Sequence, residues 1–517
     1  MKRLFALLLV VAMIFSLAAC SGSGENNAKP ASSNNNTVSD AKPDTNVDVK
    51  DMPVVRMCIN KPGTGEDEEK VEAVVNKILA EKYGIQIDIV LKQDNTQLNL
   101  MLTGGEDSVD IFTSFWFMSQ STLYTNGQLL DLAPYMDTYG AGIEELFKDW
   151  PEILSCGKIG DGLYGLPAYT AWSTPNIYTC KKSVSDAAGI DWSKVHTLAD
   201  ATEAMVAMKK ATPSTYLIPG ATQTYWVPKD LDDLGDSKYL GVILNPDVST
   251  TVENYYESAQ FLDFMDQVKI WKENDIISPD PMSNDQATLF NVMYGVTDGT
   301  PGYSFSIDEF CYESNIQQNL NGDMVGAEIG GRYITTGTVQ TYMWHVSSFT
   351  KVPEAAVTLL NALYTDTDLA FALAYGIEGE HYVVDENGQL RYPTDANGNM
   401  VGAFDDKWCG MPMDYWPNIS GCPTFWYQPV NKSEMMMETN HEAKKSLALG
   451  FVFDPSPVAD EMAACSSVVD QYYLPLINGE MDPESGLATL QQALKDAGVD
   501  KIVAEKQAQL DAWLAAK

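Results

Sequence analysis

Aromatic side chains in predicted loops are the residues of this chain with the clearest binding chemistry. The sequence contains 11 tryptophans and 25 tyrosines. Trp116 directly follows the apolar run Val109–Phe115, which predicts a buried strand, and open α/β sheets bind ligands beyond the carboxyl ends of their strands. Aromatic faces cover the flat C–H faces of sugar rings, and polar side chains bind the hydroxyls around them. Trp116 is therefore the first candidate contact, with Phe115 and Ser114 beside it; the alternative is that Trp116 packs under the next helix.

A second group of aromatic residues is the densest in the chain. It spans 19 residues, is interrupted by glycine and proline, and comprises Trp408, Asp414, Tyr415, Trp416, Phe425 and Trp426. Such a loop is either a ligand platform or a cap packed on the core. The following run, Met435–Met437, is expected to fill a gap in the core.

Residues for catalysis or metal binding are harder to find. The sequence has no G-x-S-x-G, H-E-x-x-H or Walker A motif, and the stretch around Ser304 lacks the second glycine of a nucleophile elbow. Only four histidines occur, and none of the seven cysteines after Cys20 forms a C-x-x-C pair. Most of these cysteines are expected to be buried, although Cys409 and Cys422 could pair. We expect no enzyme activity, no metal and no cofactor.

The first 50 residues predict export and attachment to a membrane. Lys2 and Arg3 precede an apolar segment of 16 residues, Leu4–Ala19, which is shorter than the ~20 residues of a membrane-spanning helix and has the layout of a secretory signal. Leu17-Ala18-Ala19-Cys20 resembles the bacterial lipobox, in which the signal (1–19) is removed and the cysteine carries lipid; an ordinary signal peptide is the alternative. Residues 20–50 then form a lipidated cysteine and a disordered, polar tether.

Charge narrows the choice of partners. Lys2 and Arg3 are the only charged residues in 1–19, so the mature chain has 31 basic and 71 acidic residues and a net charge of −40. Such an acidic surface argues against nucleic acid as a partner. About 465 residues remain after the tether, which is too many for one core and predicts two lobes.

Alternating elements at the start of the folded region predict an α/β unit. Residues 53–60 form an apolar, strand-like run, 66–85 have valines and leucines at helical spacing up to Gly84, and 85–92 alternate like a strand. A helix over 95–107 and the strand 109–115 continue the order. Strand, helix, strand, helix, strand is typical of a mainly parallel sheet.

Several motifs then indicate a family. Leu102-Thr103-Gly104-Gly105-Glu106, Val109-Asp110-Ile111-Phe112 and a tryptophan, Asn126–Leu132, Gly160–Pro167 and 176–191 follow one another along the chain. In order and spacing they resemble the extracellular solute-binding proteins of ABC importers, of the kind that binds sugars and oligosaccharides. The segment from Phe451 onward resembles a larger, LipO-like lipoprotein subgroup with its own C-terminal segment.

This resemblance implies a type II periplasmic-binding-protein-like clamp, with two α/β lobes, several hinge crossovers and a helical C-terminal extension. It implies an N-terminal lobe over 51–170 plus about 303–343, and a C-terminal lobe over 171–302 plus about 344–517. It also implies ligand-binding residues at the crossovers, each of which could instead be structural: Tyr169 and Trp172 at the first, Tyr303 at the second, and Arg332, Tyr342 and Trp344 at the third.

The resemblance implies that the protein captures a carbohydrate, specifically an oligosaccharide, and delivers it to ABC permease subunits. The protein would act as a monomer, held by a palmitate-type lipid on Cys20 at the outer face of the membrane of a Gram-positive-type bacterium. Three alternatives stay open: a binder of peptides or other polar metabolites, the ligand-presenting subunit of a sensor, and a surface-tethered carbohydrate-active enzyme. Carboxylate pairs such as Asp308-Glu309 would serve that enzyme only at a defined separation across a cleft.

Overall fold

The computed structural model describes residues 51–517 apart from 61–63, 93–94, 106, 116–117, 174–175, 219–229, 237, 279–304, 309–323, 395–397, 399–406, 409–414 and 427. The signal, Cys20 and the tether lie outside the described residues. Within the described part, no helix combines the length and apolar character needed to span a membrane.

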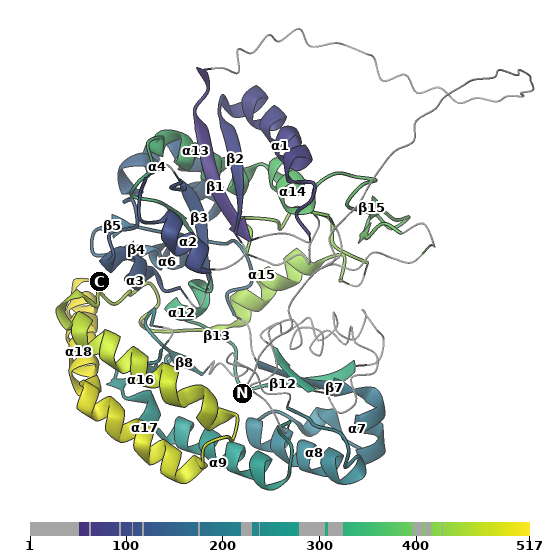
Figure 1. The fold of residues 1–517 in the computed structure, drawn as a ribbon, viewed down its shortest axis with the longest axis vertical. Coiled ribbons are helices and arrows are strands. Elements are labelled where there is room, and N and C mark those ends of the chain that lie inside the picture. Colours follow the sequence, from purple (N-terminus) through teal and green to yellow (C-terminus); the bar gives the residue numbers. More distant parts are fainter. Residues whose placement is uncertain are drawn as a thin grey trace, which may run out of the picture. The chain divides into compact units, whose positions relative to one another are not determined.

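The first sheet has five strands in the order β2-β1-β3-β14-β6. Figure 1 shows the first three of them, β2, β1 and β3. β1 (Val54–Asn60) pairs in parallel with β2 (Gln86–Lys92) and β3 (Ile111–Phe115). β14 (Tyr342–Val346) lies antiparallel between β3 and β6 (Leu166–Pro167). The expected parallel α/β unit is therefore present, and it is extended by strands from later in the chain.

Helices around this sheet complete a first hydrophobic core. α1 (Glu68–Tyr83) buries Val71, Val75 and Leu79 at helical spacing, and it ends at Gly84, whose φ of 66° is left-handed and suits glycine. The other helices on this core are α4 (Ala133–Tyr139), α5 (Ala141–Leu146), α6 (Pro151–Ser155), α12 (Thr336–Val339), α13 (Pro353–Thr365) and α14 (Thr367–Tyr375). α2 (Asn95–Met101) and α3 (Gln120–Thr125) contribute to a separate, smaller apolar cluster around Phe112 of β3. The small hairpin β4 (Lys158–Ile159) and β5 (Gly162–Leu163) adjoins α6.

A second core forms around two smaller antiparallel sheets. One has the order β11-β7-β12, with β7 (Asn176–Lys181), β11 (Phe305–Asp308) and β12 (Met324–Ile329). The other has the order β10-β9-β8, with β8 (Leu231–Asp232), β9 (Val242–Leu244) and β10 (Val252–Glu253). The helices of this core are α7 (Lys182–Ala188), α8 (Leu198–Ala211), α9 (Ala259–Glu273), α16 (Ala459–Ile477), α17 (Pro483–Ala497) and α18 (Val499–Ala516).

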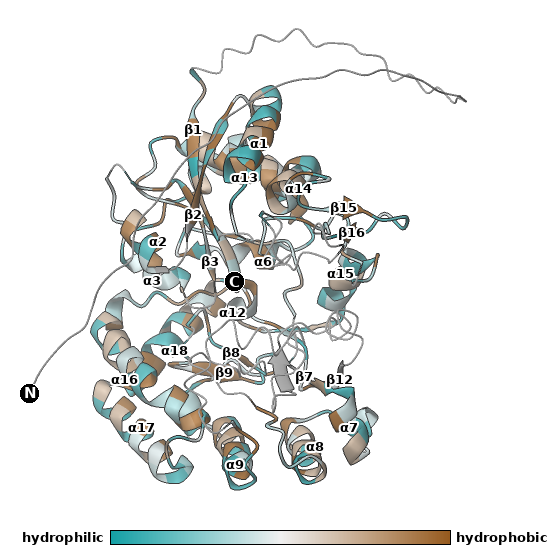
Figure 2. Cartoon of the chain, turned by 45° about the vertical axis from the view of Figure 1, so that its right-hand side comes forward, coloured by the Kyte–Doolittle hydropathy of each residue, from teal (hydrophilic) through white to brown (hydrophobic). Residues whose placement is uncertain are grey.

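Amphipathic sequence explains these helices. α9 buries an apolar stripe at helical spacing, Phe261, Phe264, Met265, Val268 and Trp271. In Figure 2, α9 and α17 carry both apolar and polar residues along their length, as expected of helices with one buried face. The predicted C-terminal amphipathic helices are α17 and α18, and both contribute to the second core.

Along the residues that the structure describes, the chain passes between the two cores three times. Trp172 belongs to the first core and Tyr178 to the second. Ile329 belongs to the second core and Ile334 to the first, and Ala443 belongs to the first core and Phe451 to the second. We call the segments 169–178, 329–334 and 443–451 the first, second and third crossings. β13 (Tyr333–Ile334) on the second crossing pairs in parallel with β17 (Lys444–Lys445) on the third.

The second and third crossings differ from the predicted lobe boundaries. Residues 303–343 were assigned to the N-terminal lobe, but β11 and β12 both pair with β7 of the second core. Residues 344–443 were assigned to the C-terminal lobe, but β14 pairs with β3 in the first sheet, and α13 and α14 bury their apolar faces in the first core. The predicted lobe boundaries are wrong at these two places because strand pairing joins residues that are far apart in sequence.

A hairpin after α14 is built around an Asn-Gly turn. β15 (Val383–Val384) and β16 (Leu390–Arg391) flank Asn387-Gly388, and Gly388 has a φ of 77°. The Asp385 side chain accepts hydrogen bonds from the backbone N–H groups of Asn387 (2.9 Å) and Gln389 (3.1 Å). The second Asn-Gly pair, Asn397-Gly398, begins outside the described residues.

Candidate functional site

Most of the predicted tryptophan contacts are packed inside the first core. Trp172, Trp344 and Trp408 are at most 1% exposed, and Trp416 is 4% exposed. The indole N–H groups of the first three donate to backbone oxygens of Ala168, Tyr415 and Leu373, at 2.9, 2.7 and 2.9 Å. All four rings are buried and the first three have satisfied N–H groups, so they hold the core together instead of forming an open binding surface.

The predicted contacts on β3 and β14 are also covered. Phe115 packs edge-on against Tyr342, with ring centroids 5.7 Å apart, and both are buried. The Ser114 hydroxyl lies 2.8 Å from Nε2 of His345 in the interior. Trp116, Tyr303 and Asp414 lie outside the described residues.

Arg332 and Trp426 are partly buried but have partners within the protein. The Arg332 guanidinium pairs with the Glu328 carboxylate, and its Nη1 donates to the Thr439 hydroxyl at 3.1 Å. Arg391 lies over the Trp426 ring, with its guanidinium carbon 5.5 Å from the ring centroid. These two predicted contacts therefore have structural partners.

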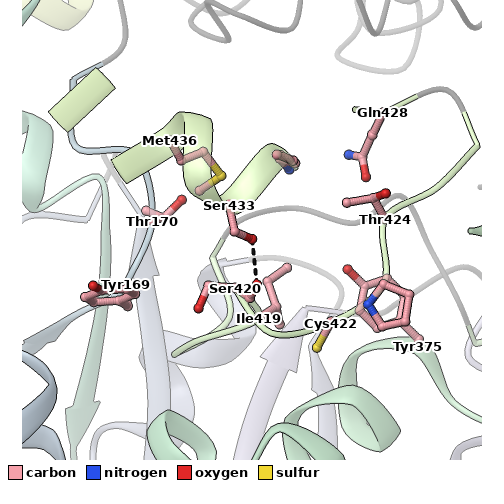
Figure 3. A pocket seen from close by; sticks show the side chains of 12 residues that line it. Tyr169, Thr170, Tyr375, Ile419, Ser420, Cys422, Thr424, Gln428, Ser433 and Met436 are labelled. Atoms are coloured by element: carbon pink, nitrogen blue, oxygen red, sulfur yellow. Dashed lines mark hydrogen bonds between the residues drawn. The ribbon is translucent and has the colours of Figure 1, made fainter. Parts of the chain in front are cut away.

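Tyr169 is the predicted residue that the structure places in a pocket. Figure 3 shows this pocket, which is small and partly open to solvent. Helix α15 (Lys432–Glu442), the loop 419–424 and the first crossing form its walls. The lining residues are Tyr169, Thr170, Tyr375, Ile419, Ser420, Cys422, Pro423, Thr424, Gln428, Lys432, Ser433 and Met436.

Local contacts fix the aromatic wall. Tyr169 lies edge-on to Phe147 and Trp172, with centroid distances of 5.5 and 5.7 Å, and its backbone N–H donates to the Pro417 oxygen at 2.8 Å. The first crossing thus holds Tyr169 against the core while leaving it partly exposed. An exposed face on a rigid aromatic ring suits stacking against an apolar ligand surface.

Hydrogen bonds also order the polar wall. The Ser433 hydroxyl donates to the Ser420 oxygen at 2.6 Å, as Figure 3 shows, and the Ser420 hydroxyl donates to Oδ1 of Asn418 at 2.7 Å. The amide of Gln389 donates to Oγ1 of Thr424 (3.2 Å) and to the Gln428 oxygen (2.9 Å). Both serine hydroxyls keep lone pairs for a ligand hydroxyl, and the Thr424 hydroxyl keeps its proton to donate.

The charged residues and the thiol that line the pocket are typical of a ligand-binding site and not of a catalytic site. None of the lining residues is a carboxylic acid, and Lys432 is the one cation among them. Burial raises the pKa of the Cys422 thiol to about 12, so it stays protonated and unreactive at neutral pH. In the described part of the chain Cys422 is a free thiol, and its predicted partner Cys409 lies outside that part.

Ser114 and His345 are as close as the serine and histidine of a catalytic triad, but their surroundings differ from those of a triad. The Ser114 hydroxyl and His345 Nε2 are 2.8 Å apart, but the other ring nitrogen lies 2.7 Å from the Tyr164 carbonyl oxygen, where a triad would have a carboxylate. Burial lowers the pKa of His345 to about 4, and both side chains are inside the core. Among the described residues, no group of three or more His, Cys, Asp or Glu side chains could hold a metal.

Sequence reasoning missed α15 as a wall of this site. Met436 lines the pocket instead of only filling the core, and Asn440, which is 0% exposed, binds the first crossing. The run from Lys432 to Glu442 is mostly polar, with three methionines. Its polarity indicates an exposed helix but carries no signal of a pocket.

Comparisons with known proteins agree with this architecture. A domain family described as "Domain of unknown function (DUF3502)" matches residues 447–515, which include α16, α17 and all but the last residue of α18. A "Carbohydrate ABC transporter substrate-binding protein" from Streptococcus pneumoniae is 24% identical over 531 residues, covering 99% of this chain and 98% of that protein.

Two solved structures illustrate the shared fold. The N-glycan transport solute binding protein NgtS from Streptococcus pneumoniae, in complex with Man5GlcNAc, has a TM-score of 0.71 at 20% identity, covering 90% of this chain and 99% of that one. The S. pneumoniae ABC-transporter substrate binding protein FusA, in complex with kestose, has a TM-score of 0.60 at 13% identity, covering 90% of this chain and 100% of that one. The chain therefore has the two-domain fold of extracellular solute-binding proteins, which confirms the resemblance indicated by its sequence motifs.

Proposed function

We propose that this protein captures an oligosaccharide outside the cell and delivers it to an ABC permease. The observation that carries the proposal is the similarity, over nearly the whole chain, to a carbohydrate ABC transporter substrate-binding protein. The pocket beside Tyr169 supports it, because it combines an aromatic face with several hydroxyl groups and an amide. Sugars are recognised by this combination of stacking and directed hydrogen bonds.

Capture would work by closure about the three crossings. The two cores are separate, and short segments such as β13 and β17 join them. Hinge closure is favoured by a ligand that makes contacts in the closed arrangement that it lacks in the open one. The protein would act without catalysis, and the energy for transport would come from ATP hydrolysis by partner subunits.

Anchoring is the second part of the proposal. Cleavage before Cys20 and lipidation of that cysteine would hold the monomeric protein at the outer face of the membrane, with residues 21–50 as a tether. The test is to express the full chain and a Cys20→Ser variant in a Gram-positive host and fractionate the cells. Recovery of the parent with membranes and of the variant in the medium supports anchoring, and equal release of both refutes it.

A thermal-shift panel tests ligand capture. The chain from residue 51 would be screened against Man5GlcNAc, kestose, other oligosaccharides, peptides and amino acids. A ligand at a hundredfold excess over its Kd stabilises the native state by about 2.7 kcal/mol, so the unfolding midpoint should rise measurably. A shift with peptides alone would overturn the sugar assignment. Mass spectrometry of the recovered sugar would detect cleavage and thereby favour the alternative of a surface-tethered enzyme.

A further inference from the structure

Helix α15 contributes to the pocket with its first turns. Lys432, Ser433 and Met436 are pocket residues, and the Ser433 hydroxyl fixes the helix to the loop 419–424 through its 2.6 Å bond to the Ser420 oxygen. Figure 3 shows Ser433 and Met436 projecting from this helix toward the loop and the first crossing. A ligand filling the pocket would therefore press directly on α15.

The last turns of the same helix bind the first crossing. Oδ1 of Asn440 accepts the backbone N–H of Trp172 at 2.8 Å, and Nδ2 of Asn440 donates to the Thr170 oxygen at 2.9 Å. Asn440 is 0% exposed. Since unpaired buried polar groups are costly, this two-point attachment makes α15 and the first crossing move together.

The other two crossings also meet the end of α15. On the second crossing, Arg332 donates from Nη1 to Oγ1 of Thr439 at 3.1 Å, while its pairing with Glu328 ties it to β12 of the second core. The third crossing continues directly from α15 into β17, where the backbone N–H of Lys444 donates to the Arg332 oxygen at 3.1 Å. One helix thus contacts the pocket and all three crossings.

We propose that α15 transmits occupancy of the pocket to the hinge, with Asn440 and Thr439 as positioning residues. The proposal rests on the proposed function in taking the pocket as part of the ligand site. A ligand that displaces or orders the Met436 turn shifts the Asn440 turn as well, because both belong to one helix. The crossings then move with it, so binding at one core alters the segments that join it to the other.

Hydrogen–deuterium exchange of the chain from residue 51 tests this coupling. One arm uses no ligand and compares the parent with Asn440→Ala and Thr439→Val. The control is Thr358→Val, because the Thr358 hydroxyl bonds only the Glu354 oxygen of its own helix at 2.8 Å. Loss of one such hydrogen bond is expected to speed exchange about tenfold in peptides covering β13 and β17, whereas the control leaves them unchanged.

The second arm adds Man5GlcNAc as the probe. In the parent, the sugar should slow exchange in peptides of all three crossings. In Thr439→Val, which replaces a hydroxyl by a methyl group and should fold normally, the sugar should still protect the pocket loop 419–424 but no longer protect β13. A purely structural role for Thr439 would leave the protection of β13 intact, and that result refutes the proposal.

The two arms separate the failure of the inference from that of the proposed function. If Man5GlcNAc leaves exchange in the parent unchanged, the sugar assignment fails for this probe, and the ligand-free arm still decides the coupling. If Asn440→Ala accelerates exchange only at Thr170–Trp172 and not at β13 or β17, α15 does not link the crossings, whatever the ligand is.

Discussion

Replacing Lys506 by methionine should be among the most damaging single substitutions in this protein. Lys506 lies on α18, and its side chain is 0% exposed. The ammonium group donates to Oδ2 of Asp236 (3.0 Å) and to the Gly241 oxygen (2.9 Å), and it lies 5.4 Å from the centre of the Phe453 ring. Methionine keeps much of the apolar stem but removes the charge and its hydrogen bonds.

The size of the stability loss depends on Asp236, which stays buried when Lys506 is removed. The Asp236 side chain is 9% exposed, and without Lys506 its carboxylate keeps only hydrogen bonds from backbone N–H groups such as that of Leu240, at 2.9 Å. Removing one member of a buried ion pair costs about 3–5 kcal/mol, because the other charge stays buried without compensation. Neutralising both residues, in Lys506→Met with Asp236→Asn, should restore most of that loss.

Urea unfolding followed by circular dichroism measures this loss at pH 7. The matched control is Lys501→Met on the same helix, because Lys501 pairs with Glu461 at 2.6 Å but its side chain is 70% exposed. Exposed pairs contribute little, so the control should unfold close to the parent. If Lys506→Met unfolds at the same urea concentration as Lys501→Met, or if the double variant is no more stable than Lys506→Met, the buried ion pair does not stabilise the fold as argued.

Three further predictions follow from buried or linked polar groups. Burial and the adjacent Asp232 raise the pKa of Asp233 to about 7, so the native state binds this proton more tightly than the unfolded chain. The free energy of unfolding should therefore fall as pH rises from about 4 to about 7, and thermal melts across that range should show a flatter profile for Asp233→Asn. Gln389→Ala should weaken sugar binding about tenfold in calorimetry, because Gln389 holds the loop 424–428; unchanged affinity would exclude that loop from the site. Cys422 should resist iodoacetamide at pH 8 until urea is added, and labelling of the native protein, detected by peptide mass spectrometry, would contradict its burial.

Local patterns were enough to predict many individual elements. Valines at helical spacing before Gly84 predicted α1, the alternation over 85–92 predicted β2, and the apolar run 109–115 predicted β3. These features depend on periodicity and turn chemistry within a few residues, which the sequence displays directly.

Long-range strand pairing and the burial of individual side chains could not be predicted from such local patterns. The sequence around residue 344 carries no local signal that β14 pairs with β3, which lies more than two hundred residues earlier. The lobe boundaries therefore could not be predicted from local patterns. Tryptophans placed by sequence on a binding surface, such as Trp172 and Trp344, proved to be core residues because a large apolar ring suits either environment. Asn440 looks like any surface amide in sequence, yet it is completely buried.

Titration calorimetry of the chain from residue 51 with Man5GlcNAc and kestose, with mass analysis of the recovered sugar, tests the central claim most directly. The account predicts saturable binding of at least one intact oligosaccharide, weakened by about tenfold or more in Tyr169→Ala, which removes the aromatic face, and unchanged in Tyr135→Ala. The account would be contradicted by heat from neither sugar together with binding of peptides, by recovery of a cleaved sugar, or by equal affinity in Tyr169→Ala and the parent.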